Sequence, residues 1–561
     1  MKRFLFLLVV FLPAIQLFAQ KDGKNENKFN VSGNFQSDLQ YYFEDQKIGA
    51  VAVDERLLSN SYANFMISYG KFSAGVRFEG YYNTLLGFPN SGGKNDGFGV
   101  PSYWANFTND KLEVTVGHFY EQFGNGLTLR SYEEKSLGID NAILGARVKY
   151  TIVPGVNIKG LVGKQRYYWE LSDGILRGVD GEIQFNEMIK SLNDSQFRFG
   201  IGGSFVSKYQ KEDNPIYNLP NNVATGAGRL NIGYSGFNLI SEYAYKINDP
   251  SADNNYIYRP GQAFLINATY SQKGLGVILS TKWVDNMSLR SDRNATLSDL
   301  TVSYLPEITR NYTYVLQAFY PYASQPMGEW GVKGEFFYKF KKGSKLGGKY
   351  GTTITLNYSR VHNIKKTAIN DSTPIGTSGT YGYNTSLFAV GNELYYQDIN
   401  VEISKKWSKK WYTNIAYMNL YYNYNVLMGT AGHDNVKANI GVVEATYKIT
   451  DKYALKGEVQ AMFTKQDKGN WILGQLEFTM PNWFFTVFDN WNYGNPDKDA
   501  RVHYFNVGFG YVKGGNRIQL TYGNRIQLTY GKQREGVMCV GGVCRHVPAS
   551  NGFALSISST F

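Results

Sequence analysis

The sequence predicts an all-β fold, a transmembrane antiparallel up-and-down β-barrel formed by a single domain. Apolar and polar residues alternate in many short segments, as they do in strands that separate lipid from a wet lumen. Aromatic residues make up 16% of the chain, with 44 Tyr and 35 Phe, and these residues favour strands and membrane interfaces. No segment after the amino-terminus approaches about eighteen consecutive apolar residues, which excludes helical membrane spans.

The amino-terminus has the pattern of a cleaved signal peptide, residues 1–20. Lys2 and Arg3 precede an apolar run at residues 4–17, and a cleavage region follows at residues 18–20. A polar leader occupies residues 21–27, and the barrel is predicted over residues 28–561. Because no globular segment precedes the first predicted strand, we expect no separate plug domain.

The predicted barrel begins with a strand at residues 29–43, in which Phe29, Val31 and Phe35 alternate with polar residues. The same period of two recurs near residues 72, 112, 197, 275, 336 and 453, with the charged side chains on the face opposite the apolar one. Turn signals such as Gly70-Lys71 indicate short hairpins. These segments predict about 18–24 strands, with about 22 as the best guess, because closure favours an even number. Longer polar stretches predict external loops at residues 87–100, 208–222, 248–261, 285–299 and 363–384.

The last strand is predicted at residues 551–561. One of its faces is small or polar, and the other is apolar and carries Phe553, Leu555, Ile557 and Phe561. Such a terminal strand resembles the assembly signal of outer-membrane β-barrels. The resemblance implies recognition by the barrel-assembly machinery and a carboxy-terminus in the periplasm of a Gram-negative cell. The alternative is an edge strand of a secreted β-sandwich, which the rest of the chain disfavours.

The motif NRIQLTYG occurs twice in tandem, at residues 516–523 and 524–531. Because the repeat has an even number of residues, both copies keep their side chains on the same faces. The duplication either extends one strand by about 26 Å, at ~3.3 Å per residue, or forms a loop or bulge.

The two cysteines lie on either side of Gly541-Gly542, which can form a two-residue hairpin turn. This turn places Cys539 opposite Cys544, with Cα atoms about 5.5 Å apart, and predicts a disulfide in an exported chain. A zinc site is disfavoured, because two further nearby ligands are missing. We therefore expect no metal and no other cofactor, and we expect the hairpin to lie outside the cell.

Residues 119–150 break the alternating pattern and concentrate charges of both signs between glycines. Three interpretations are open: an inward element that forms a salt-bridged constriction, a charge ladder that fills and stiffens the lumen, or a solvated external loop. The residues predicted to line the pore or its constriction are Arg77, Glu79, Arg130, Glu133, Arg147, Lys149, Arg198, Lys456, Glu458 and Arg517.

Two segments, residues 119–150 and 531–553, resemble an uncharacterised family of Bacteroidota-type, porin-like outer-membrane β-barrel proteins. The resemblance implies the barrel fold and an outer-membrane location, and it brings no substrate and no catalytic residues. The tandem NRIQLTYG departs from the family pattern, so the length of the penultimate strand is left open.

The formal net charge is +12. A basic barrel can bind outer-membrane lipid and lipopolysaccharide phosphates or bias its lumen toward anions, and ordinary loop solvation is the alternative. An exported chain is not expected to bind nucleic acid. Neither a Gly-x-Ser-x-Gly elbow nor a zincin pair of histidines is present, so no enzyme is expected. Two functions fit: a porin-like channel for passive diffusion of small polar or anionic solutes, or a non-conducting structural barrel that presents its loops to a surface, secretion or export partner.

Overall fold

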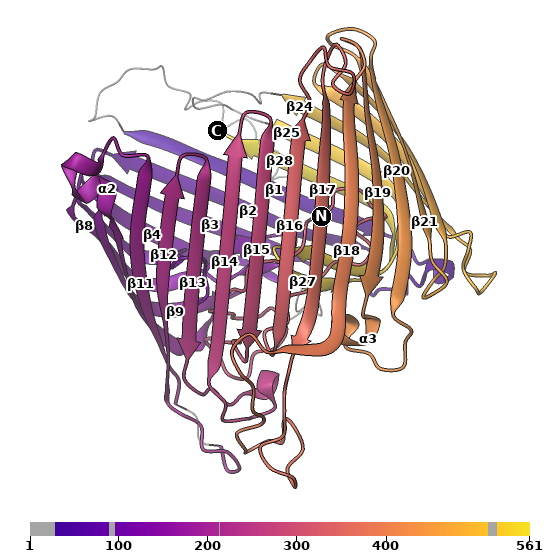
Figure 1. The fold of residues 1–561 in the computed structure, drawn as a ribbon. Coiled ribbons are helices and arrows are strands. Elements are labelled where there is room, and N and C mark those ends of the chain that lie inside the picture. Colours follow the sequence, from indigo (N-terminus) through magenta and orange to yellow (C-terminus); the bar gives the residue numbers. More distant parts are fainter. Residues whose placement is uncertain (1–28, 89–95, 212–213, 514–523) are drawn as a thin grey trace.

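The computed structural model describes residues 29–88, 96–211, 214–513 and 524–561. These residues form one closed antiparallel sheet of 24 strands (Figure 1). The predicted fold class is confirmed, and the strand number lies at the top of the predicted range, above the best guess. The expected signal peptide and polar leader lie outside the described residues. No helix in the described ranges is long and apolar enough to cross a membrane.

The barrel strands follow one another around the sheet in chain order, and each pairs with its two neighbours. They are β1 (Asn30–Tyr42), β2 (Leu57–Tyr69), β3 (Phe72–Tyr82), β4 (Gly97–Thr108), β5 (Leu112–Phe119), β8 (Ile143–Val153), β9 (Val156–Tyr167), β10 (Glu170–Gln184), β11 (Phe197–Tyr209), β12 (Asn222–Tyr234), β13 (Phe237–Lys246), β14 (Gly261–Gln272), β15 (Leu275–Asp285), β16 (Glu329–Lys339), β17 (Thr352–Ile364), β18 (Val390–Lys406), β19 (Trp411–Tyr422), β20 (Val436–Lys448), β21 (Ala454–Phe463), β22 (Trp471–Met480), β23 (Trp483–Trp491), β24 (His503–Lys513), β25 (Asn524–Gln533) and β28 (Ser550–Thr560).

Two small ladders lie apart from the barrel sheet. One pairs β6 (Glu133–Glu134) with β7 (Ile139–Asp140), and the other pairs β26 (Gly536–Val540) with β27 (Val543–Val547). The helical turns are short and lie between strands: η2 (Gln46–Ile48), α2 (Phe185–Met188), η3 (Lys190–Leu192), η4 (Ala252–Asn254) and α3 (Tyr424–Met428).

The barrel closes where the last strand meets the first. β28 pairs with β1 on one side and with β25 on the other, so the sheet leaves no free edge. The backbone N–H of Gly33 donates to the carbonyl of Phe561 at 2.9 Å, and the N–H of Phe561 donates back at 3.0 Å. The ring of Phe561 reaches the ring of Phe65, with 5.8 Å between centroids. The predicted last strand is therefore in place, and its recognition by assembly machinery stays a prediction.

The two faces of the sheet follow the predicted alternation. Phe35, Ala63 and Phe78 lie beside one another across β1, β2 and β3, and Phe78 is 45% exposed on the outer face. The neighbouring row points into the lumen, and its Arg77 is only 7% exposed. An apolar exterior around a polar interior is the arrangement of a transmembrane barrel.

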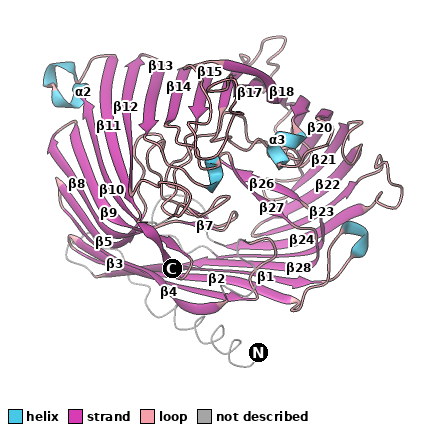
Figure 2. Ribbon diagram, turned by 90° about the horizontal axis from the view of Figure 1, so that it is seen from below, coloured by secondary structure: helices cyan, strands magenta, loops and turns pink. Residues whose placement is uncertain are grey.

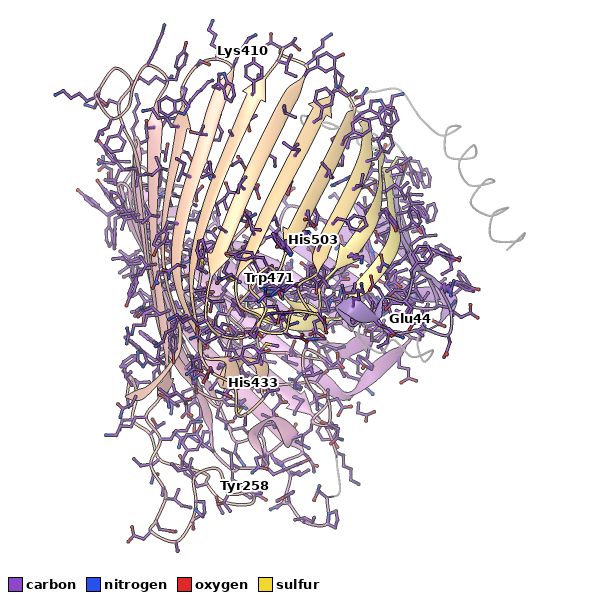
Figure 3. The ribbon with its side chains drawn as sticks, turned by 90° about the vertical axis from the view of Figure 1, so that its right-hand side faces the viewer. Glu44, Tyr258, Lys410, His433, Trp471 and His503 are labelled. Atoms are coloured by element: carbon purple, nitrogen blue, oxygen red, sulfur yellow. A yellow bond between two sulfur atoms is a disulfide. The ribbon has the colours of Figure 1, made fainter. Side chains whose placement is uncertain are left out.

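The two ends of the barrel differ in their connections. Short turns lie at the end marked by Lys410, whereas long connections lie at the opposite end, marked by Tyr258 (Figure 3). Three long connections fold into the barrel: the inward segment (residues 120–142), the crossing segment (residues 286–328) and the disulfide hairpin (residues 536–547). Their strands β7, β26 and β27 lie within the ring of barrel strands (Figure 2).

Two of the predicted external loops are wrong in part. Residues 285–299 were expected to be solvated, but Asn286, Met287 and Ser291 are fully buried. Their polar neighbours find protein partners instead of water, as in the ion pair of 2.6 Å between Arg290 and Asp253. The predicted loop at residues 87–100 is shorter, because β4 begins at Gly97. The second copy of the tandem repeat starts β25, and the first copy lies outside the described residues.

Candidate functional site in the barrel lumen

The inward segment is fastened to the barrel wall by two buried arginines. Arg77 of β3 pairs with Glu79 at 2.6 Å, with Glu133 at 2.5 Å and with Asp140 at 3.7 Å. Arg166 of β9 pairs with both Glu79 and Asp140. Two carboxylates of the segment and one of the wall thus share two guanidinium groups, and each charge is compensated where water is scarce.

A second network surrounds Glu121, at the start of the inward segment. Its carboxylate lies 3.3 Å from Arg147, 3.2 Å from Lys149 and 3.3 Å from Lys159. Burial alone would raise the pKa of Glu121, but the three cations outweigh burial and lower it. Arg147 also pairs with Glu113 of β5. The inward segment is therefore a charged element inside the barrel, and the solvated-loop interpretation of residues 119–150 is wrong.

Arg130 joins the inward segment to the crossing segment without a carboxylate. Its guanidinium carbon lies 4.4 Å from the ring centroid of Tyr132 and 3.9 Å from that of Tyr304. Its backbone N–H donates to the carbonyl of Val302 at 2.9 Å. Stacking on two aromatic faces stabilises the cation and holds the two segments together.

The crossing segment spans the lumen between distant walls. At one wall, the side-chain amide of Gln165 of β9 donates to the carbonyl of Thr301 at 3.0 Å. On the other side, the N–H of Leu316 donates to Gln460 of β21 at 2.8 Å. These contacts join residues far apart in the sequence, and no local pattern predicted them.

The base of the crossing segment is closed by a buried ion pair between the strands that flank it. Lys282 of β15 lies 2.6 Å from Glu329 of β16, and both side chains are fully buried. Lys282 also donates to the carbonyl of Pro306 at 2.6 Å, within the segment. The hydroxyl of Tyr322 and the N–H of Gln325 both donate to Glu329. The pair therefore holds the segment as well as the strands.

The disulfide hairpin contains the predicted bond between Cys539 and Cys544. Gly541 and Gly542 adopt positive φ angles of 58° and 84°, as the predicted turn requires. The Cα atoms lie 4.1 Å apart, closer than expected. Val540 and Val543 flank the turn, and the cysteines form the next pair along the ladder. This pair is non-hydrogen-bonded, and such pairs have Cα atoms only about 4.5 Å apart.

The hairpin packs against the inward elements in the lumen, and its position on the outer side of the membrane stays a prediction. The hydroxyl of Tyr304 donates to the carbonyl of Gly541 at 2.7 Å, and the N–H of Ser324 donates to the carbonyl of Gly542 at 3.0 Å. Arg545 donates to the carbonyl of Ser136 at 2.8 Å. The hairpin thus contacts both the crossing segment and the inward segment.

The remaining predicted pore residues do not join these clusters. Arg198 is exposed on β11. Lys456 of β21 pairs with Glu477 of β22 at 3.4 Å, and Glu458 accepts a hydrogen bond from Gln460 at 2.5 Å. Arg517 lies outside the described residues. The described members of the predicted set therefore do not form one cluster.

Cavities of different size remain around the inward elements. A wide cavity, about 1610 Å³, lies along β1–β5 and is lined by Asn34, Asn64, Arg77, Ser102 and Thr115 among others. A small one of about 40 Å³ lies at the Arg77 cluster, and one of about 390 Å³ lies between the crossing segment and the disulfide hairpin. In the described part of the chain, no group of three or more His, Cys, Asp or Glu side chains could hold a metal ion.

Comparison with known proteins places the whole chain in one family. The model of a family of unknown function, DUF6029, matches residues 1–561. The chain belongs to this family. Its membership agrees with the resemblance to an uncharacterised family, and a Bacteroidota-type origin stays a prediction. No curated protein matches the chain.

Solved structures with a similar fold include a translocation pore, a siderophore receptor and a porin. The P pilus usher PapC is 8% identical, with 95% of this chain and 98% of that chain covered and a TM-score of 0.41. The siderophore receptor PirA from Pseudomonas aeruginosa is 11% identical, with 95% and 80% covered and a TM-score of 0.38. A BenF-like porin from Pseudomonas fluorescens Pf-5 is 9% identical, with 80% and 97% covered and a TM-score of 0.29. These values concern the barrel fold alone.

Proposed function

We propose that this protein is an outer-membrane channel for the passive diffusion of small polar solutes, narrowed by its own inward segments. The supporting observation is the crossing segment, which is hydrogen-bonded to Gln165 of β9 at one wall and to Gln460 of β21 at another. A polar cavity of about 1610 Å³ lies along β1–β5 beside the inward segment. Solutes would enter such a vestibule and pass the constriction around Arg77 and Arg147.

The pairing of charges favours neutral or zwitterionic solutes at this constriction. Arg77, Arg147 and Arg166 each have a carboxylate within ion-pair distance. A cation that is already neutralised by a protein carboxylate attracts a passing anion less strongly. The net charge of +12 therefore gives less support to anion selectivity than the sequence alone gave.

Conductance in a planar bilayer tests the channel. We expect discrete steps, with a reversal potential near zero under a salt gradient. Replacing Arg130 by Ala removes the stacking on Tyr132 and Tyr304 and should raise the conductance. Arg198→Ala is the matched control, because Arg198 is exposed on β11 and outside these clusters. Equal conductance of wild-type protein and Arg130→Ala would remove Arg130 from the constriction.

A second candidate, a non-conducting interaction barrel, is favoured by the buried fastening of the crossing segment through Lys282 and Glu329. If that segment never moves, the lumen stays closed and the long connections serve a surface, secretion or export partner. A silent bilayer with protein that still changes its gel mobility on boiling supports this candidate. A partner that co-purifies with wild-type protein, and is lost when residues 365–389 are shortened, would then identify the binding loop.

A further inference from the structure

The cavity of about 390 Å³ between the crossing segment and the disulfide hairpin has aromatic walls and polar ends. Tyr312, Phe319 and Tyr320 line it from the crossing segment, and Arg534 and Val537 line it from the hairpin side. Cavities of this size, with apolar walls and a few placed polar groups, are typical of small-molecule sites.

Arg534 is a partly buried cation whose guanidinium has no direct ion pair among the described residues. Its guanidinium carbon lies 3.5 Å from the ring centroid of Phe319. Its hydrogen bonds go to two backbone carbonyls, of Glu535 at 3.1 Å and of Phe319 at 3.4 Å. Among the described residues, no carboxylate oxygen lies within 4.0 Å of a guanidinium nitrogen of Arg534. Arg77 and Arg310, in contrast, both have carboxylate partners in the lumen.

Gln317, another residue that lines the cavity, has an unsatisfied donor. The residue is 3% exposed and lines the cavity. Its Nε2 is buried and has no hydrogen-bond partner within the described residues. A buried amide donor without an acceptor costs free energy, so an acceptor delivered by a ligand would be favoured there.

The acidic residues of the cavity do not cancel this cationic end. Glu535 is engaged by Lys468 at 2.9 Å. Asp467, which also attracts Arg534, accepts a hydrogen bond from the hydroxyl of Tyr320 at 2.8 Å. Glu307 accepts a hydrogen bond from Asn311 at 2.8 Å, and its Cα lies near the tip of the hairpin at Gly542. Arg534 precedes the base of the same hairpin, and strand residues rise about 3.3 Å each. Glu307 and Arg534 therefore mark opposite ends of the cavity.

We propose that this cavity binds a small organic carboxylate, with its anionic group at Arg534 and Gln317 and its apolar part against Phe319 and Tyr320. The inference deepens the proposed channel function, because it gives the lumen a solute-binding site. It does not depend on the paired arginines of the constriction. A guanidinium with free donors and an aromatic platform matches a carboxylate joined to an apolar group.

Binding of phenylacetate to the refolded full-length protein tests this site, with the neutral phenylacetamide as the matched probe. Trp471 provides a readout by fluorescence, because its ring centroid lies 6.0 Å from the Arg534 guanidinium, and calorimetry provides a second. Arg534→Gln should weaken phenylacetate binding by at least about tenfold, the loss of one charge-assisted hydrogen bond. Gln317→Leu should weaken it less, and Arg525→Gln, an exposed arginine of β25, should leave it unchanged.

Phenylacetate binding that exceeds phenylacetamide binding and depends on Arg534 supports the site. Equal binding of the two probes, an unaffected Arg534→Gln variant, or no binding to folded wild-type protein overturns it. Conductance measured on the same preparation separates the two proposals. Binding without conductance retains the site and contradicts the channel, whereas conductance without binding retains the channel and contradicts the site.

Discussion

Replacing Glu329 by Gln should release the crossing segment while the barrel stays folded. In the wild-type protein, Glu329 lies 2.6 Å from Lys282, with both side chains fully buried. It also accepts hydrogen bonds from the hydroxyl of Tyr322 and from the N–H of Gln325. The substitution keeps the size of the side chain and removes its charge, so Lys282 is left buried without a counterion.

The size of the effect follows from these contacts. Removing one partner of a buried ion pair lowers the folding stability by about 3–5 kcal/mol. The amide of Gln retains part of the hydrogen bonding, and two protein oxygens, of Pro306 and Ser324, still accept from Lys282, so we expect the lower end, about 3 kcal/mol. If this loss lowers the free energy of local opening of the crossing segment, the fraction of molecules with an open segment rises by about two orders of magnitude.

Limited proteolysis in detergent measures this opening, because the crossing segment contains Arg290, Arg293 and Arg310 as cleavage sites. Glu329→Gln should be cut faster within residues 286–328, with an unchanged boiling-dependent gel shift. Glu477→Gln on β22 is the control, because its carboxylate is partly exposed and pairs at 3.4 Å with Lys456 of the neighbouring barrel strand. The double variant Lys282→Met, Glu329→Leu should recover part of the protection, since apolar residues replace the unpaired charge. Unchanged proteolysis of Glu329→Gln, or loss of the whole barrel, would refute the reasoning.

Three further outcomes are expected. Cys539→Ser with Cys544→Ser should destabilise the hairpin by about 2 kcal/mol, measured as faster hydrogen exchange confined to residues 536–547. Acidification should loosen the inward segment as the pH falls below 4.5, the ordinary pKa of Glu121. Because the pKa of Glu121 is lowered in the folded protein, its carboxylate stabilises the fold fully above this pH and progressively less as the pH falls toward the folded pKa. Proteolysis of residues 120–142 as a function of pH checks this, with Glu121→Gln showing a smaller change. Gly542→Val should undock the hairpin, because φ is 84° and a Cβ would lie 2.6 Å from Ser324 Oγ; wild-type exchange rates in this variant would contradict that.

The barrel wall could be predicted because its physical cause is local. A strand between lipid and a wet lumen must alternate, so Phe78 faces outward while Arg77 and Glu79 face inward in consecutive positions. The disulfide was predictable for a similar reason. Cys539 and Cys544 are separated by one tight turn, and the turn alone brings them together.

The candidate site could be predicted only in part. The charges of residues 119–150 indicated an unusual element, and Arg77 and Glu133 do meet there. The partner Arg166 was missed, because its approach to Glu79 depends on how β3, β9 and the inward segment come together. Sequence distance hides such contacts, and polar composition does not distinguish a loop solvated by water from one whose polar groups satisfy each other inside a wide barrel.

A signal for the crossing segment was nevertheless present in its tyrosines. A solvated loop gains nothing from large aromatic side chains, whereas a buried tyrosine contributes apolar area and needs one acceptor for its hydroxyl. Tyr304, Tyr312 and Tyr320 each find that acceptor, at the carbonyl of Gly541 and at the carboxylates of Asp398 and Asp467. Tyrosines clustered in a long connection between barrel strands therefore favour an inward course, because only the lumen offers both the apolar contact and the protein acceptors.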